Sequence, residues 1–213
     1  MSKALVLFSG GMDSTTGLYW ALAQGWEVSA LCFDYPSRPN GEIKAAEEIA
    51  QRLGVPMINA SLPFVRTAKD LANVRPMPEA SAGVGYVPMR NMMFYAVAGY
   101  FAELYGMDRI LGGHTKEDSK FYSDASPDFF RLVELVYKQT LSQSYVSSNR
   151  EIKIILPLAQ LEDAQAGKLG KELGVPFSLT WSCWHDGQAH CGRCYSCLGR
   201  QAALDSLDPA NKL

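Results

Sequence analysis

The residues best suited to chemistry near the start of the chain are 9–14, with the sequence SGGMDS. They directly follow the apolar run 4–8 and precede a stretch with helical hydrophobic spacing. Two adjacent glycines let the backbone turn sharply and approach a ligand without a Cβ atom in the way. Serine hydroxyls and the N–H groups that open the next helix can then converge on phosphate oxygens. No lysine follows the glycines, so the pattern predicts a phosphate-binding loop that differs from the common G-x-x-x-x-G-K-[ST] type.

A second group of reactive side chains lies near the other end of the chain, where four of the five cysteines fall within residues 183–197. A disulfide framework for a fold of this size would be spread more widely, so in a reducing compartment the clustering favours a metal site. Four thiolates suit a closed tetrahedral zinc site, in which metal binding folds a region too polar to build its own core. The turn-forming Gly187 and Gly192 lie between the expected ligands, which are Cys183, Cys191, Cys194 and Cys197.

Alternatives for the cysteine cluster stay open at this point, namely an iron–sulfur cluster or free thiols. His185 or His190 could replace one cysteine as a ligand, although we expect both to be ordinary loop residues. The fifth cysteine, Cys32, ends an apolar run, and we expect a small buried residue rather than a nucleophile. Our prediction is structural zinc held by all four clustered cysteines.

Apolar runs and amphipathic stretches alternate along the chain, which predicts an α/β fold with a parallel sheet covered by helices on both faces. In open sheets of this kind ligands bind beyond the carboxyl ends of the strands, where the glycine loop lies. The polar, proline-dotted segment 61–87 is expected to form surface loops. The expected strands are 4–8, 27–33, 55–60, 108–111 and 151–156, and the expected helices are 15–24, 42–53, 91–105, 128–141 and 160–173.

Length and composition are those of an ordinary soluble domain. The 213 residues fit one large domain, or one domain with a small appendage, and 47% are hydrophobic. A net charge of −2 disfavours a protein whose main task is to grip nucleic acid, so no stable nucleic-acid partner is expected. No apolar stretch approaches the roughly 18–20 residues that cross a bilayer, and no signal-peptide pattern is present. We therefore expect a cytoplasmic protein without a membrane partner.

The loop resembles the pyrophosphate loop of the N-type ATP pyrophosphatases, which split ATP into AMP and pyrophosphate to activate a substrate. Together with the cysteine cluster, nearly the whole chain resembles the 7-cyano-7-deazaguanine synthase family of queuosine biosynthesis. The acidic helix after Tyr35-x-x-Arg38 is similar as well. The most specific matches are residues 8–16, 86–91 and 179–183, and the C-terminal pattern Cys191-Gly192-x-Cys194-x-x-Cys197-x-x-Arg200.

The resemblance implies an adenine-nucleotide alpha-hydrolase-like (PP-loop), Rossmann-type domain over residues 1–180, with a zinc-binding motif over 181–206 packed on it. It implies Zn²⁺, Mg²⁺ and ATP as co-substrate, and an ATP-dependent carbon–nitrogen ligase. The implied reaction converts a small deazapurine carboxylate, 7-carboxy-7-deazaguanine, and ammonia to the nitrile through an adenylated carboxylate and an amide. The family also implies a homodimer.

The resemblance also implies the site residues. Catalysis is assigned to Asp13, Ser14 and Arg90, and metal binding to the four clustered cysteines. The residues expected to hold the nucleotide are Phe8, Ser9, Gly10, Gly11, Met12, Asp13, Ser14, Arg38, Arg90, Asn91, Gly113 and Asp118.

For some of these residues the sequence leaves a structural role open. Asp13 could orient the loop or help hold Mg²⁺, or it could only cap the following helix. Arg90 and Asn91 precede a long apolar helix, so they could contact nucleotide or substrate, or cap that helix. On the same helix, aromatic residues form either a dimer face or part of the core, which is the commoner case; they are Phe94, Tyr95, Tyr100 and Phe101.

One segment departs from the family pattern. Residues 121–126 have the sequence FYSDAS where the family usually carries Gly-Tyr-Pro-Asp-Cys-Arg. An arginine missing opposite a carboxylate removes a strong bidentate contact, and His114, Lys116 or Lys120 could supply that charge. The acceptor is therefore open, and a divergent relative that adenylates another carboxylate is one alternative. An RNA sulfurtransferase and a non-catalytic nucleotide-binding protein are the others.

Overall fold

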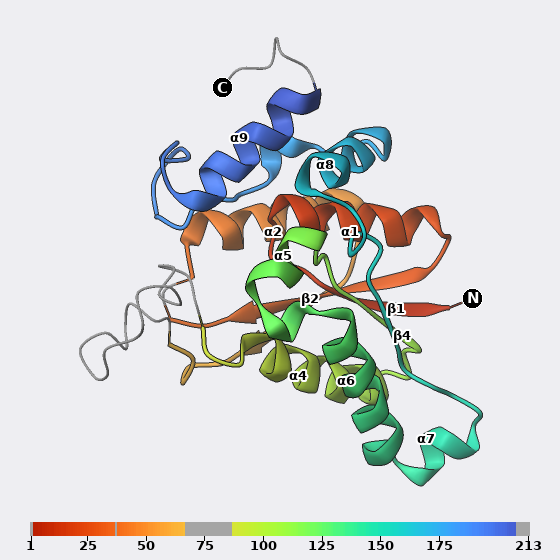
Figure 1. Cartoon of the computed structure of the whole chain (residues 1–213). Coiled ribbons are helices and arrows are strands. Elements are labelled where there is room, and N and C mark those ends of the chain that lie inside the picture. Colours follow the sequence, from red (N-terminus) through yellow and green to blue (C-terminus); the bar gives the residue numbers. More distant parts are fainter. Residues whose placement is uncertain (1, 37, 67–86, 208–213) are drawn as a thin grey trace.

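A computed structural model of the protein describes residues 2–36, 38–66 and 87–207. Its centre is a five-stranded parallel sheet in the order β3-β2-β1-β4-β5, with helices on both faces (Figure 1). The predicted α/β class and all five predicted strands are confirmed. The strands are β1 (Lys3–Leu7), β2 (Glu27–Asp34), β3 (Met57–Ser61), β4 (Arg109–Leu111) and β5 (Lys153–Ile155).

The helices form two layers around this sheet. Figure 1 shows α1 and α2 on one face and α4 and α6 on the other. Outside α1, helix α8 packs against α1 and α9 packs against α8. The longer helices are α1 (Met12–Ala23), α2 (Asn40–Leu53), α4 (Arg90–Leu104), α6 (Pro127–Thr140), α8 (Asp163–Glu172) and α9 (Tyr195–Leu207), and the short ones are α5 (Lys116–Phe121), α7 (Gln143–Ser147) and the 3₁₀ turns η2 (Ser123–Ala125) and η3 (Phe177–Leu179).

The sequence did not predict α5, α7 and α9. The first two are shorter than the window over which hydrophobic periodicity can be recognised. Helix α9 begins directly after a clustered cysteine and carries a glycine in its interior, both of which weaken a helical signal. Most of the segment expected as surface loops, residues 67–86, lies outside the described residues.

The core lies on both faces of the central strand because successive side chains of a strand point to opposite sides. Leu5 is fully buried in a cluster with Tyr95 of α4 and Phe130 of α6. Its neighbour Val6 is fully buried in a second cluster, with Leu18 of α1 and other residues of α1 and α2. Each such side chain contributes about 1.5–3 kcal/mol through burial. The sheet that carries the candidate site is therefore held rigidly from both sides.

The aromatic residues of α4 differ in how deeply they are buried. Tyr95 is fully buried, whereas Tyr100 is 61% exposed. Phe94 and Phe101 pack partly buried against the core. None of the helices in the described part of the chain combines the length and the hydrophobicity needed to cross a membrane.

Candidate functional site

The loop of residues 9–14 follows the end of β1 and runs into the first turn of α1, at the carboxyl edge of the sheet. The Ser9 and Ser14 hydroxyls are 3.0 Å apart, and the backbone N–H groups of Ser9 and Gly11 donate to them at 3.2 Å and 3.1 Å. Both hydroxyls thus lie at the centre of the loop, beside the N–H groups that open α1. This arrangement can donate several hydrogen bonds to phosphate oxygens.

The glycines of the loop are required by its conformation and by close neighbours. Gly10 has φ of 88°, and a Cβ atom there would lie 2.6 Å from the backbone nitrogen of Ala46 in α2. At the end of β4, a Cβ atom on Gly113 would lie 2.8 Å from the backbone nitrogen of Ser14. The loop is therefore enclosed by backbone from two sides, which fixes its shape before any ligand binds.

Asp13 is the second residue of α1. The N-cap of the helix is Gly11, which makes no side-chain hydrogen bond, so Asp13 lies in the first turn of α1 and not at the cap position. Burial, and then repulsion from Asp118 and Asp163, raises the pKa of Asp13 to about 7. Asp163 of α8 had no motif to mark it. A hard cation among these carboxylates would relieve their repulsion and could bridge to phosphate oxygens.

Asp118 and Asp163 are held in place by Thr115, which precedes α5. The Thr115 backbone N–H donates to Asp118 Oδ2 and its hydroxyl donates to Asp163 Oδ1, both at 2.9 Å. Burial raises the pKa of Asp118. Because Thr115 joins α5 to the start of α8, the two carboxylates keep a fixed position relative to the loop.

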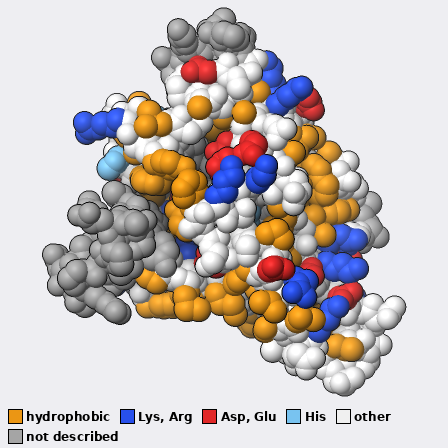
Figure 2. Space-filling model, in the orientation of Figure 1, with side chains coloured by type: hydrophobic (Ala, Val, Ile, Leu, Met, Phe, Trp, Pro, Cys, Tyr) orange, Lys and Arg blue, Asp and Glu red, His pale blue; other side chains and the backbone are white. Residues whose placement is uncertain are grey.

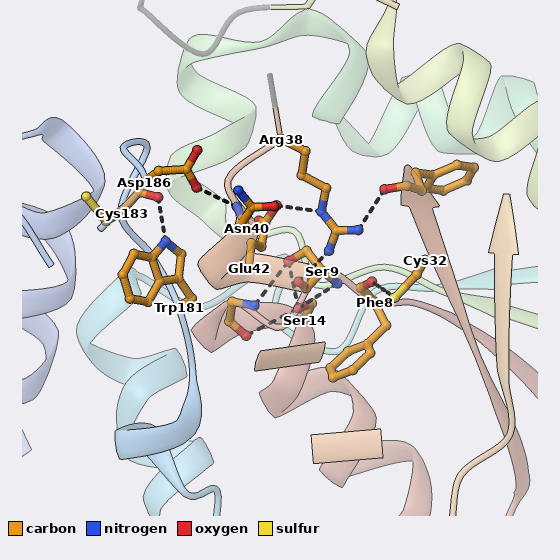
Figure 3. A network of polar contacts seen from close by, with 12 residues as sticks. Phe8, Ser9, Ser14, Cys32, Arg38, Asn40, Glu42, Trp181, Cys183 and Asp186 are labelled. Carbon is orange, nitrogen blue, oxygen red and sulfur yellow. Dashed lines mark hydrogen bonds and ion pairs between the residues drawn. The ribbon is translucent and has the colours of Figure 1, made fainter. Parts of the chain in front are cut away.

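Arg38 lies beside the loop with only 4% of its side chain exposed. Its guanidinium donates to the Ser9 carbonyl at 2.8 Å, to the Phe33 carbonyl at 2.7 Å and to Glu42 at 2.8 Å (Figure 3). Three of its five N–H groups therefore hold the loop to β2 and α2. A contact of Arg38 with the nucleotide stays a prediction, whereas its contact with the loop is observed.

Arg90 and Asn91 open α4, where the N-cap residue Met89 makes no side-chain cap. Asn91 is buried, and its side-chain amide donates to the Asp124 carbonyl at 2.8 Å. The Asn91 backbone N–H donates to Asp124 Oδ2 at 3.2 Å. Asn91 thus holds the turn that departs from the family pattern, while the Arg90 cation lies near enough to lower the pKa of Asp118, against the larger effect of burial.

The residue that replaces the family's arginine in this turn has a structural role. Ser126 is the N-cap of α6: its hydroxyl accepts from the Phe129 N–H at 3.2 Å and donates to the Ser123 carbonyl at 2.8 Å. Pro127 follows at the first helical position, where proline is favoured. Side chains of the turn therefore accept hydrogen bonds from the N–H groups at the starts of α4 and α6.

The side chains offered as substitutes for that arginine have other properties or partners. Burial, and then the nearby Arg90 charge, lowers the pKa of His114 to about 4, so the imidazole is neutral at pH 7. Lys116 pairs with Glu162 at 2.7 Å. Lys120 pairs with Glu117 at 2.7 Å and with Glu162 at 3.2 Å. These lysines link α5 to α8 at the surface, where Figure 2 shows neighbouring acidic and basic side chains.

The structure brings all four clustered cysteines together, with their sulfur atoms within 4.8 Å of one another. The sulfurs of Cys191 and Cys197 are 3.9 Å apart, and Zn–S bonds of about 2.3 Å in a tetrahedron place sulfurs about 3.8 Å apart. Backbone N–H groups of His185 and Cys191 lie 3.4 Å from the Cys183 sulfur, as suits a thiolate. The cluster therefore fits a tetrahedral metal ion.

The remaining cysteine and the nearby histidine are engaged elsewhere. His190 Nε2 accepts from the Ser182 N–H at 3.1 Å, and its ring stacks on Trp181. Cys32 is 3% exposed, and its thiol donates to the Phe8 carbonyl at 2.9 Å. Burial raises the pKa of that thiol to about 11. Cys32 is thus a buried neutral thiol, as the sequence predicts.

Comparison with known proteins identifies the family to which the chain belongs. Residues 3–208 match the model of the family described as "Queuosine biosynthesis protein QueC". A 7-cyano-7-deazaguanine synthase of Nostoc punctiforme is 36% identical, over 96% of this chain and 96% of its own length. A protein of the same name from Thermoplasma acidophilum is 35% identical, over 93% of this chain and 85% of its own length. The resemblance stated from the motifs is confirmed.

Solved structures with low identity share the fold alone. NMN synthetase of Francisella tularensis has a TM-score of 0.53 and 18% identity, over 98% of this chain and 77% of that one. A 4-thiouridine synthetase solved with RNA and ATP has a TM-score of 0.54 and 17% identity, over 97% of this chain and 51% of that one. The predicted PP-loop type of α/β fold is confirmed.

Proposed function

The chain belongs to the QueC family of queuosine biosynthesis proteins, and on that premise we propose that it makes 7-cyano-7-deazaguanine from 7-carboxy-7-deazaguanine, ammonia and ATP. The observation that carries the proposal is the complete phosphate loop, with its paired serine hydroxyls beside the start of α1. Membership of the family supports the choice of 7-carboxy-7-deazaguanine as acceptor, and the phosphate loop supports the use of ATP.

The chemistry needs such a loop because a carboxylate oxygen is a poor leaving group. In the first step the acceptor carboxylate attacks the α-phosphorus of ATP, and pyrophosphate departs with growing negative charge. Oriented N–H groups and the hydroxyls of Ser9 and Ser14 stabilise that charge. The Arg90 cation lies near Asp118, and we assign it to the phosphate or carboxylate oxygens during transfer. Asp13 and Asp118 would hold Mg²⁺, which neutralises phosphate charge when bound.

Ammonia then attacks the acyl carbon and AMP leaves, which gives the primary amide. The amide oxygen takes AMP from a second ATP, and loss of AMP with the two amide protons gives the nitrile. Both activations need the same loop and the same departing pyrophosphate, so one site can serve them in turn.

The four cysteines would hold Zn²⁺ in a structural role. Protein sulfur would then fill all four positions of a tetrahedral ion, which would leave none for substrate. The same arrangement disfavours an RNA sulfurtransferase, because such an enzyme needs accessible catalytic thiols. Four of the five cysteines lie in the cluster, and the fifth is buried as a neutral thiol. Reduced clustered thiols also agree with a cytoplasmic location.

A homodimer is our proposal for the assembly. Figure 2 shows hydrophobic side chains along the edge of the molecule formed by α4 and α6. The exposed hydrophobic residues of these two helices are Tyr100, Leu104, Leu132, Leu135 and Val136. Light scattering of the purified protein gives its mass, and a monomer at micromolar concentration would contradict the proposal.

The function is tested by incubating the protein with ATP, Mg²⁺, ammonia and 7-carboxy-7-deazaguanine, with pyrophosphate and product mass as readouts. We expect pyrophosphate release together with the nitrile. Release of pyrophosphate without nitrile or amide would identify another acceptor, and absence of turnover would overturn the assignment.

A further inference from the structure

The cysteine cluster and the phosphate loop are joined by a continuous set of contacts, although nearly the whole chain separates them in sequence. Figure 3 shows residues from both regions in one network, with α2 between them. The contacts run through Trp181, just before the first clustered cysteine, and through Asp186, between the first two.

Trp181 connects the cluster to the loop directly. Its backbone N–H donates to the Gly10 carbonyl at 2.9 Å, and its indole Nε1–H donates to the Cys183 carbonyl at 2.9 Å. The indole packs so tightly on α2 that a Cβ atom on Gly41 would lie 2.4 Å from the ring. The His190 ring stacks on the face of the indole, with centroids 4.6 Å apart.

Asp186 connects the cluster to α2, the helix against which the loop packs. Its carboxylate accepts from the Asn40 N–H at 2.6 Å. Asn40 is the first residue of α2, and the helix has Pro39 at its N-cap with no side-chain cap of its own. Asp186 therefore supplies a cap from another part of the chain, and its negative charge suits a helix N-terminus.

The position of helix α2, which Asp186 caps, affects Gly10 of the loop. The Gly10 backbone lies against Ala46 and Glu42 of α2, so a shift of the helix start would move the loop or leave a gap. Glu42 also holds Arg38, which donates to the Ser9 carbonyl. The loop is thus placed between α2 and Trp181, and both are tied to the cysteine cluster.

We propose that Asp186 and Trp181 are positioning residues that make phosphate binding at the loop depend on an intact, metal-loaded cysteine cluster. The inference rests on the proposed function, because it takes the loop to be the phosphate site. With Cys183 and Cys191 both bound to one ion, Asp186 would be held at the start of α2 and the Cys183 carbonyl would be held at the Trp181 indole N–H. Neither residue needs to touch the nucleotide.

The test measures the affinity of the protein for inorganic pyrophosphate and for adenosine by titration calorimetry, with metal content determined on the same samples. In Asp186→Ala we expect the Kd for pyrophosphate to rise about three- to ten-fold, because a helix cap changes an equilibrium constant by roughly two- to thirty-fold and only part of that reaches the loop. Adenosine affinity and metal content should stay unchanged. A general loss of structure would weaken the binding of both pyrophosphate and adenosine.

Two further variants keep the result interpretable. Asp186→Asn retains a hydrogen-bond acceptor without the charge, so we expect a smaller rise in the Kd for pyrophosphate than in Asp186→Ala. The matched control is Asp108→Ala, which removes a carboxylate that accepts from the Lys3 N–H at 3.0 Å, at the opposite edge of the sheet. Its pyrophosphate affinity should match the wild type.

Chelation of the metal from the wild type should raise the Kd for pyrophosphate at least as much as Asp186→Ala does. Equal pyrophosphate affinity in wild type and Asp186→Ala, with metal bound in both, would overturn the inference. A wild-type protein that binds no pyrophosphate and no ATP would instead refute the phosphate-loop assignment itself.

Discussion

The phosphate loop and the 121–126 turn both belong to the carboxyl-edge region of the sheet, yet they use their polar groups differently. In the loop, Ser9 and Ser14 bond to each other and to backbone within the same short segment. In the turn, Asp124 and Ser126 bond to the N-termini of α4 and α6. The loop keeps hydroxyls and N–H groups directed at one point, whereas the turn uses its groups to hold helices.

This difference bears on the segment in which the sequence departs from the expected family pattern. The loop cannot change without losing the convergence of donors, because neighbouring backbone encloses it on two sides. In the turn, the Asp124 carboxylate and the Ser126 hydroxyl accept from the N–H groups that open α4 and α6. The position at which the family's arginine is expected is therefore occupied by a helix cap, Ser126. The loop is thus fixed by the backbone around it, whereas the turn bonds to the starts of two helices with its own side chains.

The largest effect is expected from Gly10→Ala. The new Cβ atom would lie 2.6 Å from the Ala46 nitrogen, and the alanine backbone would have to adopt the left-handed conformation that Gly10 has. We expect pyrophosphate release to fall by two orders of magnitude or more, measured with a coupled phosphate assay. The control is Gly25→Ala, which has φ of 70° but open space around it and should cost only about 1–2 kcal/mol of backbone strain. Equal activity in both variants would show that the loop is not enclosed.

Next in size is Cys197→Ala, which tests whether the cysteine cluster holds a metal ion that stabilises the fold. We expect loss of stoichiometric metal and a stability loss of several kcal/mol, because metal binding supplies folding free energy to such motifs. Metal analysis and thermal unfolding give the two quantities. Cys32→Ala removes a buried thiol outside the cluster and should retain the metal. Full metal retention by the Cys197 variant would exclude the four-sulfur site.

Asp13→Asn should change the pH dependence of stability. Because the native pKa is raised from 3.8 to about 7, the native state binds more protons than the unfolded state within this window. The contribution of Asp13 to wild-type stability therefore falls as pH rises from about 4 to about 7, and it is constant above.

Without added Mg²⁺, the Asn variant should become more stable than the wild type by about 1–3 kcal/mol at pH 8, and the gain should vanish near pH 4. Denaturant unfolding across pH checks this. Asp128→Asn, at a side chain that is 89% exposed, is the control and should show no gain that rises with pH. A pH-independent difference for Asp13→Asn would contradict the raised pKa.

The smallest effect is expected from Ser126→Ala in the turn. Removal of the α6 N-cap should lower stability by about 1 kcal/mol, seen in thermal or denaturant unfolding. ATP-dependent pyrophosphate release should stay near the wild-type rate, since the hydroxyl is engaged with the Phe129 N–H and the Ser123 carbonyl. A large fall in the release rate at unchanged stability would place Ser126 in the acceptor site and would remove the contrast with the loop.

The extent to which the sequence predicted the site differs between its parts. The loop, the four-cysteine spacing and the strands are local patterns, and the structure has them where they were expected. The start of α1 at Met12, three residues before its predicted start, follows from the loop leading straight into the helix. Asp163 and Asp186 carried no local signal, because each bonds to a segment far away in the chain, whereas Thr115 belongs to a local capping box with Asp118 and only its bond to Asp163 is distant.

The sequence by itself determined the α/β order of elements, the phosphate loop and the clustering of cysteines. These depend on hydrophobic period, glycine conformation and ligand spacing, which act over a few residues. Only the tertiary structure decided that Arg38 and Asn91 bond to the protein's own backbone and that His114 is neutral. It also decided that Trp181 and Asp186 join the cluster to the loop. Burial and hydrogen-bond partners are set by segments that meet only after folding, and residue types in sequence order do not contain those distances.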